Sequence, residues 1–176
     1  AERMNNRFGD IFTVPESSER QRIFFARDQS LRIKDLQNPL KKMSKSDDNR
    51  TATIYLLDPP KDIEKKIKRA QTDSENSVHY DVANKPGISN LMDILAAVTD
   101  QTHDQITAAY ADKGYGTFKK DVAEAVISVL EPIQNRYTEL LNAPELDDIL
   151  SDGAARAHAK ANQTYEKVLH AMGLYR

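Results

Sequence analysis

Apolar residues recur every three or four positions through most of the chain after Asp58, and this period limits the fold more than any other feature. Such a period is that of an amphipathic α-helix with one buried stripe. The longest stripe begins near Thr117 and keeps its phase past Pro132, so we expect a kink at the proline and not a break. Its positions are Phe118, Val122, Val126, Val129, Ile133, Tyr137 and Leu140. The body of the chain is therefore predicted to be a helical bundle.

Further helices are predicted around this long one from their start and stop signals. Asp58 is expected to be the N-cap of a helix with Pro59 at its first position. The apolar face of that helix would be Ile63, Ile67 and Ala70. Other helices are expected after Gly87, at the capping box of Thr102 and Gln105, and as a helical pair from Pro144 to about Met172.

The first 57 residues have a different character, with short runs typical of β-strands. Strands are expected at Ile11–Val14, in "LRIKDL" (31–36) and in "TATIYLL" (51–57), while residues 16–30 are charged and are expected to be irregular. So few strands cannot form a stable sheet of their own. We therefore expect them to complete a sheet whose other strands lie upstream of Ala1.

Composition excludes several kinds of site. The 176 residues contain no cysteine, which rules out disulfides, thiolate zinc sites and cysteine nucleophiles. The net charge is −2, from 25 basic and 27 acidic side chains, so nucleic-acid binding would need a local basic patch. No run approaches the length of about 18 apolar residues that a membrane span requires, and the first residues do not resemble a signal peptide. A cytoplasmic protein without membrane contact is expected.

The stretch "KKMSKSDD" at residues 41–48 combines lysines with serines and then changes to aspartates. Lysine carries a compact charge on a flexible stem, which suits a moving phosphate chain. No glycine-rich cradle accompanies the lysines, so the stretch is not a P-loop. The alternative is a solvated basic turn in which Ser46 or Asp47 caps the next element.

The string Lys42-Met43-Ser44-Lys45-Ser46, which we call the signature segment, is identical to the KMSKS signature of class I aminoacyl-tRNA synthetases. The blocks around it include "RIKDLQNPLKKMSKSDDN", "LLDPPKDIEKKIKRAQTDSE" and "YDVANKPGISNLMDILAAVT". Together they resemble the C-terminal half of the bacterial-type tryptophanyl-tRNA synthetases over essentially the whole chain. The second signature of that family, His-x-Gly-His, does not occur here, so the chain is expected to be a fragment.

The resemblance implies activation of tryptophan by ATP and transfer of the aminoacyl group to tRNA(Trp). Lys42 and Lys45 would be the catalytic residues, because they would stabilise charge on the phosphates as pyrophosphate leaves. Backbone at Ile33 and Met43 would border the adenine. The residues expected to bind ATP, with Mg²⁺ on its phosphates, are Ile33, Lys42, Met43, Ser44, Lys45 and Ser46.

The resemblance also implies the fold class and the domains. Residues 1–57 would be the C-terminal remnant of a Rossmann-like α/β catalytic domain, and residues 58–176 a helical anticodon-binding bundle, so the chain would be mainly α. The bundle would bind tRNA(Trp), whereas tryptophan binding and a homodimer are expected only of the full-length enzyme. Two alternatives stay open: a free-standing helical RNA-binding module without catalysis, and another class I synthetase such as the tyrosine enzyme.

Overall fold

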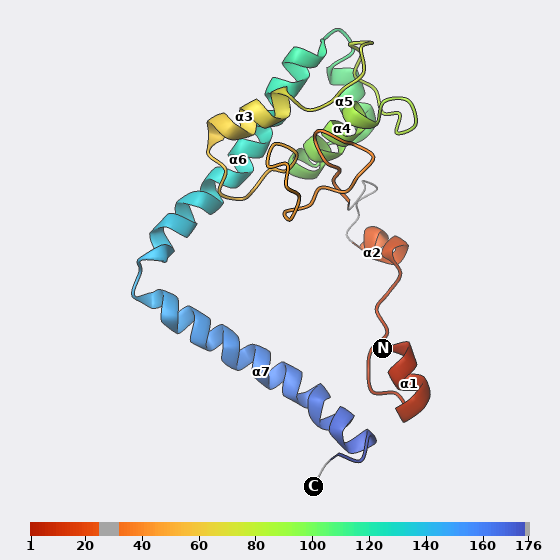
Figure 1. Ribbon diagram of the computed structural model, residues 1–176, viewed down its shortest axis with the longest axis vertical. Helices are drawn as coiled ribbons and strands as arrows, with labels where there is room; N and C mark the ends of the chain where they lie inside the picture. The colour runs from red at the N-terminus through yellow and green to blue at the C-terminus, as the bar shows by residue number, and fades with distance from the viewer. Residues whose placement is uncertain (25–31, 175–176) are drawn as a thin grey trace. The chain divides into compact units, whose positions relative to one another are not determined.

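The computed structural model describes residues 1–24 and 32–174 and divides the chain into two compact units (Figure 1). One unit comprises Ala1–Phe25 with Thr138–Arg176, and the other comprises Ala26–Tyr137. Regular structure in the described ranges is entirely helical. The mainly α fold class is therefore confirmed. None of the described helices is long and apolar enough to cross a membrane.

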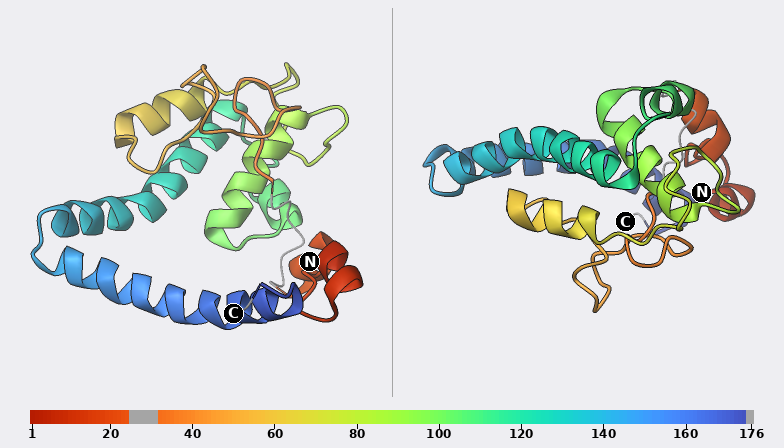
Figure 2. Two further views of the ribbon diagram at one scale, coloured as in Figure 1. Left: turned by 60° about the horizontal axis from the view of Figure 1, so that its bottom comes forward. Right: turned by 90° about the horizontal axis from the view of Figure 1, so that it is seen from above.

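The hydrophobic core lies in the unit Ala26–Tyr137 and is built by four helices. They are α3 (Pro60–Lys68), α4 (Pro86–Thr99), α5 (His103–Ala109) and the larger part of α6 (Tyr115–Leu141). Helix α3 lies alongside the first half of α6 (Figure 2). Each of these helices buries apolar side chains in the core, at Ile63, Ile67, Leu91, Met92, Leu95, Ile106, Phe118, Val122 and Val126.

The helix starts agree with the sequence in part. The capping box of α5 is confirmed, because Thr102 Oγ1 accepts a hydrogen bond from the Gln105 N–H at 3.2 Å and Gln105 Oε1 accepts one from the Thr102 N–H at 2.8 Å. The predicted N-cap of α3 is wrong, since Pro59 occupies that position and Asp58 makes no cap bond. The Asp58 carboxylate instead accepts from the Tyr55 N–H at 2.8 Å and from Lys66 Nζ at 2.5 Å.

The predicted strands are wrong in the described residues. A strand needs a continuous ladder with a neighbour, and these runs find other partners. The Ile11 and Phe12 N–H groups both donate to the side-chain oxygen of Asn5. Within the described part of "LRIKDL" there is only an isolated bridge from Lys34 to Lys42, and Leu31 lies outside the described residues. Residues 51–57 form turns and irregular backbone without strand pairing.

Helix α6 continues through Pro132, as predicted, but its apolar stripe is only half buried. Phe118 and Val122 are fully buried. The C-terminal part of α6 runs past α3 and α4 (Figure 1). Val129, Ile133 and Tyr137 accordingly remain 41–47% exposed. The prediction that the whole stripe is core is therefore wrong for its C-terminal half.

The other unit holds α1 (Glu2–Phe8), α2 (Ser18–Phe24) and α7 (Glu145–Ala171). Helix α1 ends at Gly9, whose φ of 88° only glycine adopts readily. Helix α2 corrects the expectation that residues 16–30 are irregular, although 25–31 lie outside the described residues. Helix α7 is one continuous helix and not the predicted pair. Residues with high helix propensity follow Gly153, and the Arg156 side chain forms an ion pair at 3.1 Å with Asp152, one turn earlier in the helix.

Candidate functional site

The signature segment lies in irregular backbone that precedes α3 and is paired with residues 33–35. Lys34 and Lys42 form the antiparallel bridge, and the Met43 N–H donates to the Ile33 carbonyl at 3.0 Å. On the other side of the bridge the Asp35 N–H donates to the Lys41 carbonyl at 3.0 Å. The two residues expected to border adenine, Ile33 and Met43, are thus brought together by the backbone.

Side chains of the signature segment divide between the core and solvent. Met43 is half-buried and packs with Ile33 against the hydrophobic core. Lys42, Lys45 and Ser46 are exposed, and the Ser44 and Ser46 hydroxyl oxygens lie 3.1 Å apart. Among the described residues, neither lysine ammonium has an ion-pair partner. Two exposed ammonium groups three residues apart are suited to bind adjacent oxygens of a polyphosphate.

The segment is held on its C-terminal side by residues that precede α3. The buried Thr53 donates its hydroxyl to the Ser44 carbonyl at 3.0 Å. The Tyr55 hydroxyl lies 3.5 Å from the Lys45 carbonyl. Lys66 of α3 in turn donates to the Thr53 carbonyl at 2.8 Å. These contacts fix the backbone of the segment and leave its lysine side chains in solvent.

A second group of contacts comes from α4. Asn90, which is only 3% exposed, accepts a hydrogen bond from the Lys34 N–H at 2.7 Å and donates one to the Lys34 carbonyl at 3.0 Å. No role was predicted for Asn90 from the sequence. The available signal was its place beside Ser89 and before Asp93 in an otherwise apolar helix, since a buried polar side chain requires a partner.

A basic hollow of about 250 Å³ lies between residues 50–58, which follow the signature segment, and α3. Its cations are not equivalent, because Lys66 is already paired with Asp58. Arg50 and Lys66 also lie over the Tyr55 ring, at 5.2 and 4.8 Å from its centroid. The hollow is lined by Arg50, Thr51, Asp58, Asp62, Lys65, Lys66 and Arg69.

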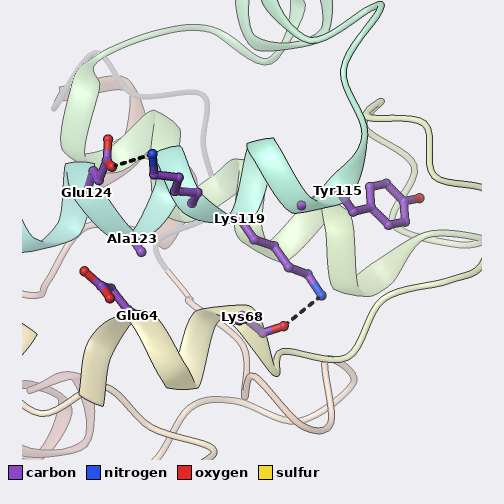
Figure 3. Close-up of a pocket in the computed structure, with 8 residues that line it drawn as sticks. Glu64, Lys68, Tyr115, Lys119, Ala123 and Glu124 are labelled. Atoms are coloured by element: carbon purple, nitrogen blue, oxygen red, sulfur yellow. Dashed lines mark hydrogen bonds and ion pairs between the residues drawn. The ribbon is translucent and has the colours of Figure 1, made fainter. Parts of the chain in front are cut away.

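A larger pocket of about 660 Å³ lies between α3 and α6 (Figure 3). Three of its charged side chains, Lys119, Lys120 and Glu124, already have partners. Lys119 Nζ donates to the Ala70 carbonyl at 2.8 Å and reaches the Lys68 carbonyl at 3.5 Å, so it satisfies carbonyls at the C-terminal end of α3. Burial lowers the pKa of Lys119. Lys120 pairs with Glu124 at 3.5 Å. This pocket contains no residue of the predicted site.

A buried lysine cluster was also missed by the sequence analysis. Lys85 is 2% exposed, and its Nζ lies 2.6 Å from Glu75, 3.1 Å from Asp73 and 3.1 Å from the Tyr115 hydroxyl. Burial acts to lower the pKa of Lys85, but hydrogen bonds to these groups outweigh it and hold the pKa above its usual value. Burial acts to raise the pKa of Asp73, yet bonds from Tyr115, the Glu75 backbone and Lys85 lower it to about 2. The cluster ties the loop before α4 to the start of α6.

Asp93 and His103 form a second buried polar contact. Their Oδ1 and Nε2 atoms lie 3.0 Å apart, without an aligned hydrogen bond, and the Tyr80 ring stacks on His103 at 3.9 Å. Burial raises the pKa of Asp93. This contact joins α4 to the start of α5 and lies apart from the signature segment in the sequence. Its geometry indicates a structural role.

The protein family described as "tRNA synthetases class I (W and Y)" matches residues 2–131, which is about three quarters of the chain. The chain therefore belongs to the class I tRNA synthetases of the tryptophan and tyrosine type. Within this family it is 50% identical over 176 residues to the tryptophan–tRNA ligase of Bacillus subtilis and 48% identical to that of Bacillus anthracis. All of this chain is matched, and it spans 51% of each ligase.

Solved structures also show similarity to tryptophanyl-tRNA synthetases. The tryptophanyl-tRNA synthetase of Mycoplasma pneumoniae superposes with a TM-score of 0.74 at 31% identity, over 82% of this chain and 46% of that one. The enzyme of Campylobacter jejuni, solved with ADP and tryptophan, has a TM-score of 0.59 at 27% identity, over 98% of this chain and 51% of that one. The resemblance to the C-terminal half of the bacterial tryptophan enzyme is confirmed.

Proposed function

We propose that this chain forms the C-terminal half of a tryptophan–tRNA ligase, which activates tryptophan with ATP and transfers it to tRNA(Trp). One observation carries the proposal: a class I synthetase chain presents an intact KMSKS string with both lysine ammonium groups in solvent. Relatives that match the full chain are tryptophan enzymes, which favours tryptophan over tyrosine as the amino acid.

In this proposal the signature segment stabilises charge and performs no acid–base or nucleophilic chemistry. Lys42 and Lys45 bind phosphate oxygens of ATP and gain strength as negative charge develops on the leaving pyrophosphate. Ser44 and Ser46 add hydroxyl donors. The paired backbone of Ile33 and Met43 supports the adenine. Each charge-assisted contact is worth about 1.5–3 kcal/mol, or roughly ten- to a hundredfold in rate.

Magnesium would be bound through ATP and not by a cage of protein ligands. Among the described residues there is no group of three histidine or carboxylate side chains that could hold a metal. Mg²⁺ keeps several waters and favours phosphate oxygens, so it fits a phosphate chain held by two lysines. Its contribution would be to neutralise phosphate charge, while the lysines orient the leaving group.

Domains and partners follow from the same proposal. Residues 1–57 are assigned to the end of the catalytic domain and residues 58–176 to the anticodon-binding bundle. The bundle would receive tRNA(Trp), while the tryptophan pocket and the homodimer interface would need the remaining half of the ligase. The enzyme would act in the cytoplasm.

The test is amino-acid-dependent exchange of labelled pyrophosphate into ATP by the full-length protein. The proposal predicts exchange with tryptophan and background with tyrosine. Exchange with tyrosine alone would support the tyrosine enzyme. Absence of exchange with either amino acid, together with retained binding of tRNA, would support a helical RNA-binding module without catalysis.

A further inference from the structure

One side chain of α4 holds the backbone that pairs with the start of the signature segment. Lys34 uses neither its N–H nor its carbonyl in the bridge to Lys42, because the bridge bonds are made by its neighbours Ile33 and Asp35. Both backbone groups of Lys34 bind the Asn90 side chain, at 2.7 and 3.0 Å. Asn90 therefore takes the place that a third strand would have beside residues 33–35.

This support matters because the bridge is isolated. A single pair of backbone bonds outside a sheet has little stability of its own. The only side chain among the described residues that binds both Lys34 backbone groups is Asn90, 56 positions further along the chain. At 3% exposure, the Asn90 amide has little access to water that could replace these bonds.

We propose that Asn90 is a positioning residue for the phosphate chemistry of the signature segment, which makes this inference depend on the proposed function. Asn90 fixes Lys34, and Lys34 with Ile33 sets the backbone of Lys42 and Met43. The Asn90 side chain touches neither lysine ammonium group and would not contact ATP. Asn90 would hold the Lys42 backbone in one position, so that the lysine needs little reorganisation when negative charge develops on the leaving pyrophosphate.

The other end of the segment is held independently. Thr53 binds the Ser44 carbonyl at 3.0 Å, and this contact involves no residue of α4. Loss of Asn90 should therefore loosen the segment at Lys42 and Met43 while Ser44 stays attached. This asymmetry distinguishes a positioning role from general loss of folding.

Three variants of the full-length ligase test the proposal. Asn90→Asp keeps the size and the acceptor but places a carboxylate oxygen against the Lys34 carbonyl, and Asn90→Ala removes both bonds. Ser89→Ala is the matched control, because Ser89 is the neighbouring buried residue and its hydroxyl accepts from the Asp81 N–H at 2.9 Å, away from the signature segment. Single-turnover formation of tryptophanyl-adenylate should slow about tenfold in both Asn90 variants. Tryptophan affinity should change less than about twofold.

A second measurement needs no activity. Hydrogen exchange of the Lys34 and Met43 amides, followed by NMR on the 176-residue chain, should show protection that Asn90→Ala removes and Ser89→Ala retains. Unprotected Lys34 and Met43 amides in the unmodified chain would overturn the inference, even if an Asn90 variant failed to fold.

The outcomes separate the inference from the function on which it rests. If Lys42→Ala slows adenylate formation but Asn90→Asp behaves as Ser89→Ala does, the positioning role is wrong and the proposed function stands. If the unmodified full-length protein forms no tryptophanyl-adenylate, the proposed function is wrong. A fall in tryptophan affinity equal to the fall in rate would show that Asn90 acts on the whole fold.

Discussion

At the scale of single residues, the chain contains two kinds of lysine. Lys42 and Lys45 are exposed and have no ion-pair partner among the described residues, which suits a charge that must reach a ligand. Lys85 is buried among Asp73, Glu75 and Tyr115, so its charge is fully used within the fold. The sequence alone treats these lysines alike, since only the string around Lys42 distinguishes it.

The buried cluster predicts a loss of stability in acid. The folded pKa of Asp73 is about 2, below its usual 3.8, so its contribution is present above about pH 4 and is lost as the pH falls towards 2. Between pH 5 and pH 2.5 the chain should lose about 1 kcal/mol more free energy of unfolding than an Asp73→Asn variant, allowing for solvent screening. Urea denaturation at several pH values measures this. Asp112→Asn, at an exposed carboxylate, is the control and should follow the unmodified chain.

At the scale of elements, the helices of the core were predictable from the sequence, whereas α2 and the strand positions were not. The spacing of the apolar residues Ile63, Ile67 and Ala70 is a local property of the sequence, and it correctly predicted a helix at α3. The run at 51–57 has β-branched residues, but strand pairing depends on partners distant in sequence, and the described backbone offers none. The contact of Asn90 with Lys34 joins residues 56 positions apart, so no local sequence pattern predicts it. The signature string identified the site, but its backbone pairing came only from the structure.

Helix α4 makes a close contact that tests its packing. A Cβ added at Gly87 would lie 2.1 Å from the Gln71 carbonyl oxygen, so Gly87→Ala must displace backbone. We expect it to reduce the free energy of unfolding by about 1–3 kcal/mol. The matched control is Gly116→Ala in α6, where nothing lies within 4 Å and the same change should stabilise the helix by about 0.5–1 kcal/mol. Thermal unfolding of both variants decides, and equal midpoints would show that the Gln71 contact is wrong.

At the scale of the whole molecule, stability and exposed apolar surface are divided between the two units. The core cluster lies entirely in the unit Ala26–Tyr137, whereas no residue of α1 or α7 is buried. The helices from Asp58 to Met172 were predicted to form one bundle, and this prediction stays untested. Period alone cannot show whether a stripe has a partner, and Ile149, Leu150 and Tyr165 of α7 are 50–60% exposed.

This division predicts the effect of a truncation. Removal of residues 142–176 should change the unfolding midpoint of the remaining chain by less than about 3 °C, because none of the side chains described in residues 142–174 is buried. Circular dichroism at 222 nm during heating measures the midpoint. A fall of about 10 °C or more would show that α7 contributes to the core in solution.

The central claim is that the signature segment stabilises charge in the transition state of tryptophan activation. The most direct measurement is the single-turnover rate of tryptophanyl-adenylate formation by the full-length protein and its Lys45→Ala variant, with tryptophan affinity measured on each. We predict that the variant is slower by about tenfold or more, while its tryptophan affinity changes less than about twofold. Equal rates in the two proteins would contradict the claim and leave residues 42–46 as a solvated basic turn.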